Sequence, residues 1–223
     1  MKRLYTAIAL CCLFRIPAYA QDRSKVEIYS GYQLIRDDEL IEDITFSATS
    51  VFETYKRLHG FNAALEYKIR SRIGIVGELG HGRTSPAISY SIDFAAYPQS
   101  STEYRRNQTS FLFGPRFSFG NGKIRIFGHA LLGGNRVGRG STYVIAYEDG
   151  TKDVQEGGES YTDFATAFGG GLDISLIKWI SIRPAQLDLL STYRSYDAHH
   201  QDYNQYQFRY SAGIVFKLGA TNR

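Results

Sequence analysis

The carboxyl-terminal part of the chain carries a two-residue alternation that is longer than an ordinary strand. Between Tyr206 and Leu218 the even positions are mostly aromatic or aliphatic, and the odd positions are mostly polar or small, including Arg209 and Lys217. A period of two indicates a β-strand with one apolar and one polar face. Strands of globular proteins usually have about five or six residues, whereas a strand that crosses a bilayer needs about 9–11. The alternation therefore predicts a strand long enough to cross a membrane.

The same alternation recurs in seven earlier segments. In the last of these, Ile180 and Ile182 hold outward positions before Pro184, whereas Leu187 and Leu189 hold them afterwards. A change of phase of this kind predicts a β-bulge at the proline. The eight predicted strands are residues 25–36, 58–70, 73–82, 108–119, 123–135, 161–174, 179–193 and 206–218.

The connections between the predicted strands alternate strictly between short and long. Short turns on one side and long loops on the other are typical of up-and-down barrels in outer membranes. A closed barrel is also the only β-structure that satisfies all its backbone groups in lipid. The sequence therefore predicts an all-β fold, a single eight-stranded antiparallel up-and-down transmembrane β-barrel. The short connections are residues 70–72, 120–122 and 175–178, and the long ones are residues 37–56, 83–106, 138–160 and 196–204.

The first twenty residues have the pattern of a secretory signal peptide. A basic amino-terminal region precedes a mostly apolar stretch, and Ala18-Tyr19-Ala20 has the small-x-small form of a cleavage site. We therefore expect residues 1–20 to be removed on export and residues 21–223 to form the outer-membrane barrel domain. After the leader no stretch of about twenty apolar residues remains, so no transmembrane helix is expected.

Removal of the leader changes the charge balance. The full chain has 26 basic and 22 acidic residues, and three of the basic ones lie in the leader, which leaves 23 against 22. A nearly neutral chain without a sustained lysine or arginine cluster does not indicate nucleic-acid binding. Both cysteines, Cys11 and Cys12, also lie in the leader. The remaining chain is therefore not a disulfide-stapled scaffold.

The Phe-Gly-Pro-Arg-Phe stretch at residues 113–117 and the ending at residues 209–219 complete this pattern. Together with the leader and the eight segments, they resemble the OmpA-like outer-membrane β-barrel family, the small eight-stranded porin-like domains of Gram-negative bacteria. The resemblance implies a location in the cell outer membrane and a structural, surface-interaction or narrow porin-like role, without enzymatic activity or cofactor. It also implies a monomer that contacts outer-membrane lipid and lipopolysaccharide, and that meets the barrel-assembly machinery and periplasmic chaperones during biogenesis.

The inward face of the predicted barrel carries charges of both signs. Eight strands enclose an interior that side chains can fill, and an unpaired charge in such a space is costly. We interpret these residues as a structural network of ion pairs; the alternative is a gated narrow pore in which the pairs rearrange. Arg209 is expected to pair with Glu27, on the strand beside it after closure. The inward charged residues are Glu27, Glu66, Lys68, Glu78, Arg116, Arg125, Asp173, Arg183, Asp188, Arg209 and Lys217.

Acidic side chains gather in the first and third long connections. They form either an ordinary solvated face or, through divalent cations, contacts with lipopolysaccharide. These residues are Asp37, Asp38, Glu39, Glu42, Asp43, Glu148, Asp149, Asp153, Glu156 and Glu159.

Two alternative functions stay open. The last long connection contains His199 and His200, and Ser191, Ser195 and Asp197 lie near them in the sequence. These residue types would suit an outer-membrane lipid hydrolase acting on lipid A or phospholipid. No Gly-x-Ser-x-Gly elbow and no metal-ligand spacing accompanies them, so no catalytic or metal site is predicted. A soluble lipocalin-like binding barrel is the other alternative, and it is disfavoured because such a barrel places its apolar face inside.

Overall fold

A computed structural model describes residues 24–37, 57–84, 88–92, 99–120, 123–147, 151–194 and 203–219. The predicted leader, residues 1–20, lies outside these ranges, and so do residues 38–56 and 196–202 of the long connections. Among the described residues, no helix is long and apolar enough to span a membrane. The described strands are β1 (Val26–Asp37), β2 (Arg57–Arg70), β3 (Ile73–Arg83), β4 (Ile88–Ile92), β5 (Gln99–Phe119), β6 (Ile124–Ala146), β7 (Lys152–Ile177), β8 (Ile180–Arg194) and β9 (Tyr203–Leu218).

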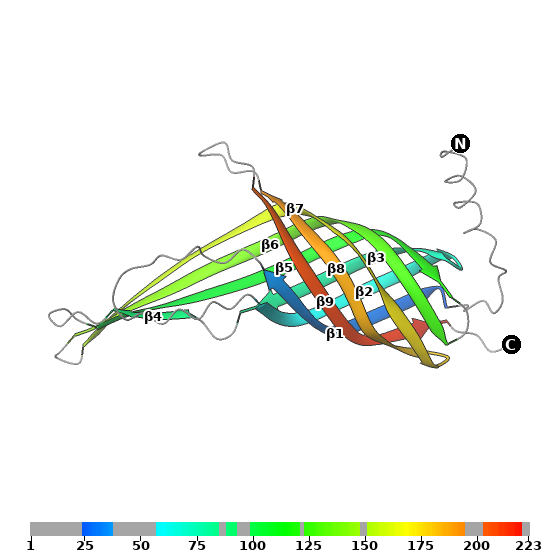
Figure 1. Ribbon diagram of the computed structural model, residues 1–223, viewed down its shortest axis with the longest axis horizontal. Helices are drawn as coiled ribbons and strands as arrows, with labels where there is room; N and C mark the ends of the chain where they lie inside the picture. Colours follow the sequence, from blue (N-terminus) through cyan, green and yellow to red (C-terminus); the bar gives the residue numbers. More distant parts are fainter. Residues whose placement is uncertain are drawn as a thin grey trace, which may run out of the picture.

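Eight of these strands close into a ring, and every pairing is antiparallel (Figure 1). The strand order runs β3-β2-β1-β9-β8-β7-β6-β5, and the additional pairing of β3 with β5 completes the ring. The first and last strands are neighbours, with Val26 opposite Leu218 and Gln33 opposite Ser211. The predicted eight-stranded antiparallel up-and-down barrel is therefore confirmed. The short strand β4 pairs only with β5 and lies outside the ring.

The three short turns lie at one end of the barrel. They join β2 to β3, β5 to β6 and β7 to β8, and the start of β1 and the end of β9 lie at the same end (Figure 1). Gly120, in the turn after β5, has a φ of 112°, a conformation that favours glycine because it has no Cβ. We call this the turn end of the barrel, and the opposite end the ribbon end.

Two of the predicted long loops are largely strand, so the sequence prediction there is wrong. Strand β5 begins at Gln99, and β6 pairs with β7 as far as Ala146 opposite Lys152. Strands β5, β6 and β7 therefore extend well beyond the ring as a ribbon that β4 borders (Figure 1). The described side chains of β7 from residue 152 to 160 are all exposed. A ribbon with both faces in solvent needs no apolar face, so the alternation that marks a half-buried strand is lost there.

The wall of the barrel is apolar outside and mostly polar inside. On β9, the side chain of Ile214 is 44% exposed, whereas that of the next residue, Val215, is 0% exposed. Aromatic and aliphatic side chains repeat this outward pattern around the ring, as a membrane-facing wall requires. Large exposed apolar side chains of the ring include Ile28, Phe61, Leu65, Ile75, Leu79, Phe111, Phe113, Phe117, Ile126, Leu132, Phe164, Phe168, Leu187, Phe208, Ile214 and Phe216.

The predicted phase change at Pro184 is confirmed. The register between β8 and β9 shifts between Arg183 and Gln186, and both of these side chains are buried. One extra residue therefore sits in β8 at this point, as in a β-bulge. The hydroxyl of Tyr210 donates a hydrogen bond of 2.7 Å to the carbonyl oxygen of Pro184, which ties the bulge to β9.

We expect Ile214→Arg to destabilise the barrel in lipid vesicles by about 2–4 kcal/mol, because a charge would then face the middle of the hydrocarbon. The matched control is Leu218→Arg, at the exposed end of the same face, where the cost falls to about 0–1 kcal/mol. Urea unfolding of the protein in vesicles measures both free energies. Equal costs at the two positions would show that no hydrocarbon layer surrounds this face.

Candidate functional site

The lumen is the candidate site, because it gathers the charged side chains of all eight ring strands. Near the turn end, Arg125 donates from Nη1 to Oε1 of Glu27 at 2.9 Å and from Nη2 to Oδ2 of Asp173 at 3.0 Å. Lys68 also pairs with Glu27, and Nε of Arg183 donates to Oδ1 of Asp173 at 2.8 Å. Two carboxylates and three cations thus form a continuous group, which we call the turn-end cluster.

A second group of charges lies midway along the barrel. Arg209 donates from Nε and Nη2 to Oδ2 of Asp188, at 3.0 and 2.7 Å, and also pairs with Glu78. Nε2 of His129 lies 2.8 Å from Oδ1 of Asp188, and the amide of Gln186 donates to both carboxylates. We call these five residues the central cluster. All of them are at least 94% buried, so their charges are compensated inside the wall rather than by solvent.

The expected pair between Arg209 and Glu27 is wrong. Glu27 is opposite Lys217 in the register of β1 and β9, and its ion pairs are with Lys68 and Arg125. Arg209 is opposite Ile35, nearer the ribbon end. Adjacent strands therefore hold the two residues at different levels of the lumen. The stagger between the strands, which the alternation does not report, decides this.

The other inward charged residues, Glu66, Arg116 and Lys217, have partners of their own. Nη1 of Arg116 donates to Oε2 of Glu66 at 3.0 Å. The guanidinium carbons of Arg116 and Arg183 each lie 4.2 Å from the ring centroid of Phe127, in cation–π geometry. The ammonium group of Lys217 donates to the Ser175 hydroxyl at 2.9 Å.

Three contacts cross the full width of the lumen. In a ring of eight, strands that are four places apart face each other, and β1 with β6, β3 with β8 and β5 with β9 are such pairs. Arg125 meets Glu27 across the first pair, and Gln186 meets Glu78 across the second at 3.2 Å. Gln108 and Gln207 exchange amide hydrogen bonds of 2.7 and 3.2 Å across the third. Side chains therefore bridge the lumen near the turn end, at its middle and toward the ribbon end.

Sequence reasoning missed the uncharged part of this filling. Gln108, Gln186 and Gln207 hold inward positions. They carry no charge, so the prediction of an inward charge network does not include them. An apolar layer also lies inside the ring, and period-two alternation does not reveal it because its members share the inward face with the ionic residues. This layer consists of Tyr29, Ala64, Val76, Leu112, Leu131, Ala165, Ala167, Leu190 and Val215.

The residues of the hydrolase alternative lie mostly outside the described part of the chain. These are Ser195, Asp197, His199 and His200. Ser191 is described, and its side chain is buried inside the barrel wall. Within the described ranges, no group of three or more histidine, cysteine, aspartate or glutamate residues could hold a metal ion.

Similar solved structures are small outer-membrane proteins. The attachment invasion locus protein Ail of Yersinia pestis is 18% identical, with a TM-score of 0.42 over 86% of this chain and 97% of Ail. Neisserial surface protein A is 10% identical, with a TM-score of 0.46 over 87% and 98% of the two chains. The outer membrane protein OprG of Pseudomonas aeruginosa is 10% identical, with a TM-score of 0.43 over 87% and 96%. No protein-family model matches the sequence, and neither does any curated protein.

We expect Arg116→Leu to destabilise the protein by about 3–5 kcal/mol, because Glu66 would keep a buried charge without its partner. The double change Arg116→Leu with Glu66→Leu should recover most of that loss, since an apolar pair can replace a buried ion pair at little cost. Urea unfolding in detergent gives the coupling energy. As a control, Arg209→Leu and Glu27→Leu should be nearly additive, because these two residues do not touch. Additivity at Arg116 and Glu66 would contradict the expected coupling.

Proposed function

We propose that the chain is an integral outer-membrane protein with a structural and surface-interaction role, and that its barrel neither conducts solutes nor catalyses a reaction. The observation that carries this proposal is the set of three contacts that bridge the lumen between opposite strands. A pore needs a continuous open path through the barrel, whereas here Gln108, Gln186 and Arg125 each meet a partner on the far wall. The ion pairs then serve to fill the barrel and to fix its shape.

The outer wall supports the membrane location. Exposed apolar side chains form a continuous surface around the ring, and such a surface is costly in water. Trp179 is exposed in the turn between β7 and β8, where an indole ring suits the boundary between hydrocarbon and headgroups. In barrels of this kind the short turns face the periplasm and the longer connections face the exterior. The ribbon of β5, β6 and β7 would then stand on the cell surface.

The ribbon supports the surface role. Its strands leave the ring as a paired sheet, so it presents side chains to the exterior from a hydrogen-bonded backbone. Three of the acidic residues assigned to a loop from the sequence, Asp153, Glu156 and Glu159, lie on strand β7 and are exposed. Binding residues often lie on segments that a rigid scaffold holds away from its core.

A conductance measurement tests the closed lumen. Folded protein in planar lipid bilayers should give no resolved single-channel steps, and vesicles that contain it should stay impermeable to small sugars. The loss of the heat-dependent gel shift that membrane barrels show would indicate that insertion had failed, so each preparation is checked by that shift. Regular conductance steps from correctly folded protein would show that the narrow-pore alternative is right.

A lipid-release assay tests the non-enzymatic part of the proposal. We expect no release of fatty acid when folded protein is incubated with phospholipid vesicles or with lipid A, because the sequence near His199 and His200 has residue types without a catalytic motif. The matched variants are His199→Ala and His200→Ala. Release by the natural protein that either variant abolishes would establish the hydrolase alternative.

A further inference from the structure

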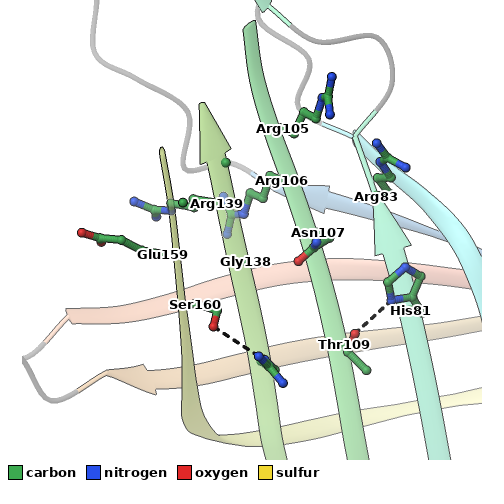
Figure 2. Close-up of a pocket in the computed structure, with 13 residues that line it drawn as sticks. His81, Arg83, Arg105, Arg106, Asn107, Thr109, Gly138, Arg139, Glu159 and Ser160 are labelled. Atoms are coloured by element: carbon green, nitrogen blue, oxygen red, sulfur yellow. Dashed lines mark hydrogen bonds between the residues drawn. The ribbon is translucent and has the colours of Figure 1, made fainter. Parts of the chain in front are cut away.

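A basic hollow of about 700 Å³ lies on the outer wall at the ribbon end, between β3, β5, β6 and β7 (Figure 2). Five of its lining residues are arginines, and three of these have exposed side chains on the outward face of neighbouring strands. His81 and Thr109 lie side by side in it, with Nδ1 of the histidine 2.9 Å from the threonine hydroxyl. We call the three arginines, Arg83, Arg105 and Arg136, the rim cluster.

The rim cluster belongs to the lipid-facing side of the wall. Arg83 follows the buried Gly82, and Arg136 lies between the buried residues Asn135 and Val137, so alternation turns both arginines outward. In the register, Arg83 is opposite Asn107, and Arg136 is opposite Thr109. The cluster thus forms one outward group across three adjacent strands.

Two of the three arginines of the cluster have no carboxylate partner among the described residues. Neither Arg83 nor Arg136 forms an ion pair with a carboxylate of the described residues, and Arg136 donates only to the hydroxyl of Ser160, at 3.3 Å. Glu159 also lines the hollow, but Figure 2 shows its carboxylate turned away from His81 and Arg83. A guanidinium group matches the geometry of phosphate oxygens, which can accept two parallel hydrogen bonds. The hollow is therefore suited to a phosphate group.

An apolar groove of about 510 Å³ lies on the same face, nearer the middle of the bilayer. Its centre is Gly77, which lies between Leu65 on β2 and Phe113 on β5. A Cβ atom at Gly77 would meet nothing within 4 Å, so the missing side chain leaves open space on the outer surface of the wall. Leu79 and Phe111 border the groove on the side of the hollow.

The groove and the hollow follow one another along β3, with Leu79 and His81 between Gly77 and Arg83. The outward positions on this strand are Gly77, Leu79, His81 and Arg83. Along this series the outward face changes from apolar to basic. At about 3.3 Å per residue, Gly77 lies roughly 20 Å from Arg83, which is similar to the length of an extended acyl chain with its headgroup. An apolar groove followed along the same strand by a basic hollow fits an amphiphile with an anionic head.

We infer that this face of β3 and β5 binds a phosphorylated lipid of the surrounding leaflet, with its phosphate at Arg83, Arg105 and Arg136 and an acyl chain in the groove at Gly77. This inference rests on the proposed membrane location. A soluble phosphate would use the rim cluster alone, whereas the groove has a role only for a lipid. The lipid would be held at a defined position on the wall rather than as part of a uniform annulus.

The test compares two site variants with one control. Arg83→Ala with Arg136→Ala removes two charges from the rim cluster, and Gly77→Leu fills the groove where space is open. The control, Arg70→Ala with Lys123→Ala, removes two exposed charges at the turn end. Native mass spectrometry of folded protein in a non-ionic detergent measures binding of three probes separately: bisphosphorylated lipid A, dephosphorylated lipid A and glucosamine 1-phosphate.

We expect bisphosphorylated lipid A to bind and each site variant to weaken it by about tenfold, a factor that corresponds to roughly 1.4 kcal/mol. The control should bind as the natural protein does. Equal binding of the phosphorylated and dephosphorylated lipids, or unchanged binding by the rim variant, would overturn the inference. If glucosamine 1-phosphate bound as strongly as the lipid, the groove would have no role in binding. That result would also overturn the inference.

The heat-dependent gel shift separates this inference from the proposed function. Each variant should keep the shift, because none of the substitutions breaks a backbone pairing or a lumen contact. A natural protein that shows no shift and does not insert into vesicles would contradict the membrane proposal itself. A correctly inserted barrel that binds phosphorylated and dephosphorylated lipid A equally well would contradict only the lipid site.

Discussion

Closure of the sheet by the pairing of β1 with β9 is the constraint on which the rest of the structure depends. A strand edge in hydrocarbon would leave backbone amides and carbonyls without partners, and each such group costs several kcal/mol. The register of twelve residue pairs, from Val26 opposite Leu218 to Asp37 opposite Gln207, removes that edge. The same register sets the level of every side chain on the two strands. The distribution of charges inside the ring is therefore a consequence of closure.

A ring of eight strands also fixes what its interior must be. The lumen is narrow enough for side chains from opposite walls to meet, as Gln108 and Gln207 do, so little room remains for water to solvate a charge. Each buried charge then needs a protein partner, and Arg209 with Asp188 and Glu78 shows how one cation can serve two carboxylates. The apolar exterior and the ionic interior are two outcomes of one alternation. A shift of a single residue would exchange them, which is why the bulge at Pro184 matters.

The sequence predicts the strands and their faces, because period-two alternation is a local property that the chain carries by itself. Ile214 and Val215 illustrate this, since neighbouring residues of a strand point to opposite faces and one of the two is therefore exposed and the other buried. The partner of Arg209 could not be predicted, because it depends on the stagger between strands that are far apart in the sequence. The ribbon could not be predicted either. Residues 152–160 of β7 are exposed on both faces, so their strand structure comes from backbone pairing with β6 and leaves no apolar period.

The length of the ribbon strands links the membrane to the surface. Strand β6 has 23 residues, which at about 3.3 Å each span roughly 75 Å, whereas the hydrocarbon core is about 30 Å thick. Even a strongly tilted strand must then continue far outside the bilayer. The outward face of β6 changes from Leu132 to Arg136, and that of β3 from Leu79 to Arg83, so on both strands the apolar surface gives way to a basic one toward the ribbon. Because the strand is unbroken across this boundary, the wall that contacts lipid and the ribbon beyond it form one continuous sheet. The ribbon is thus positioned by the barrel, because its three strands are continuations of ring strands.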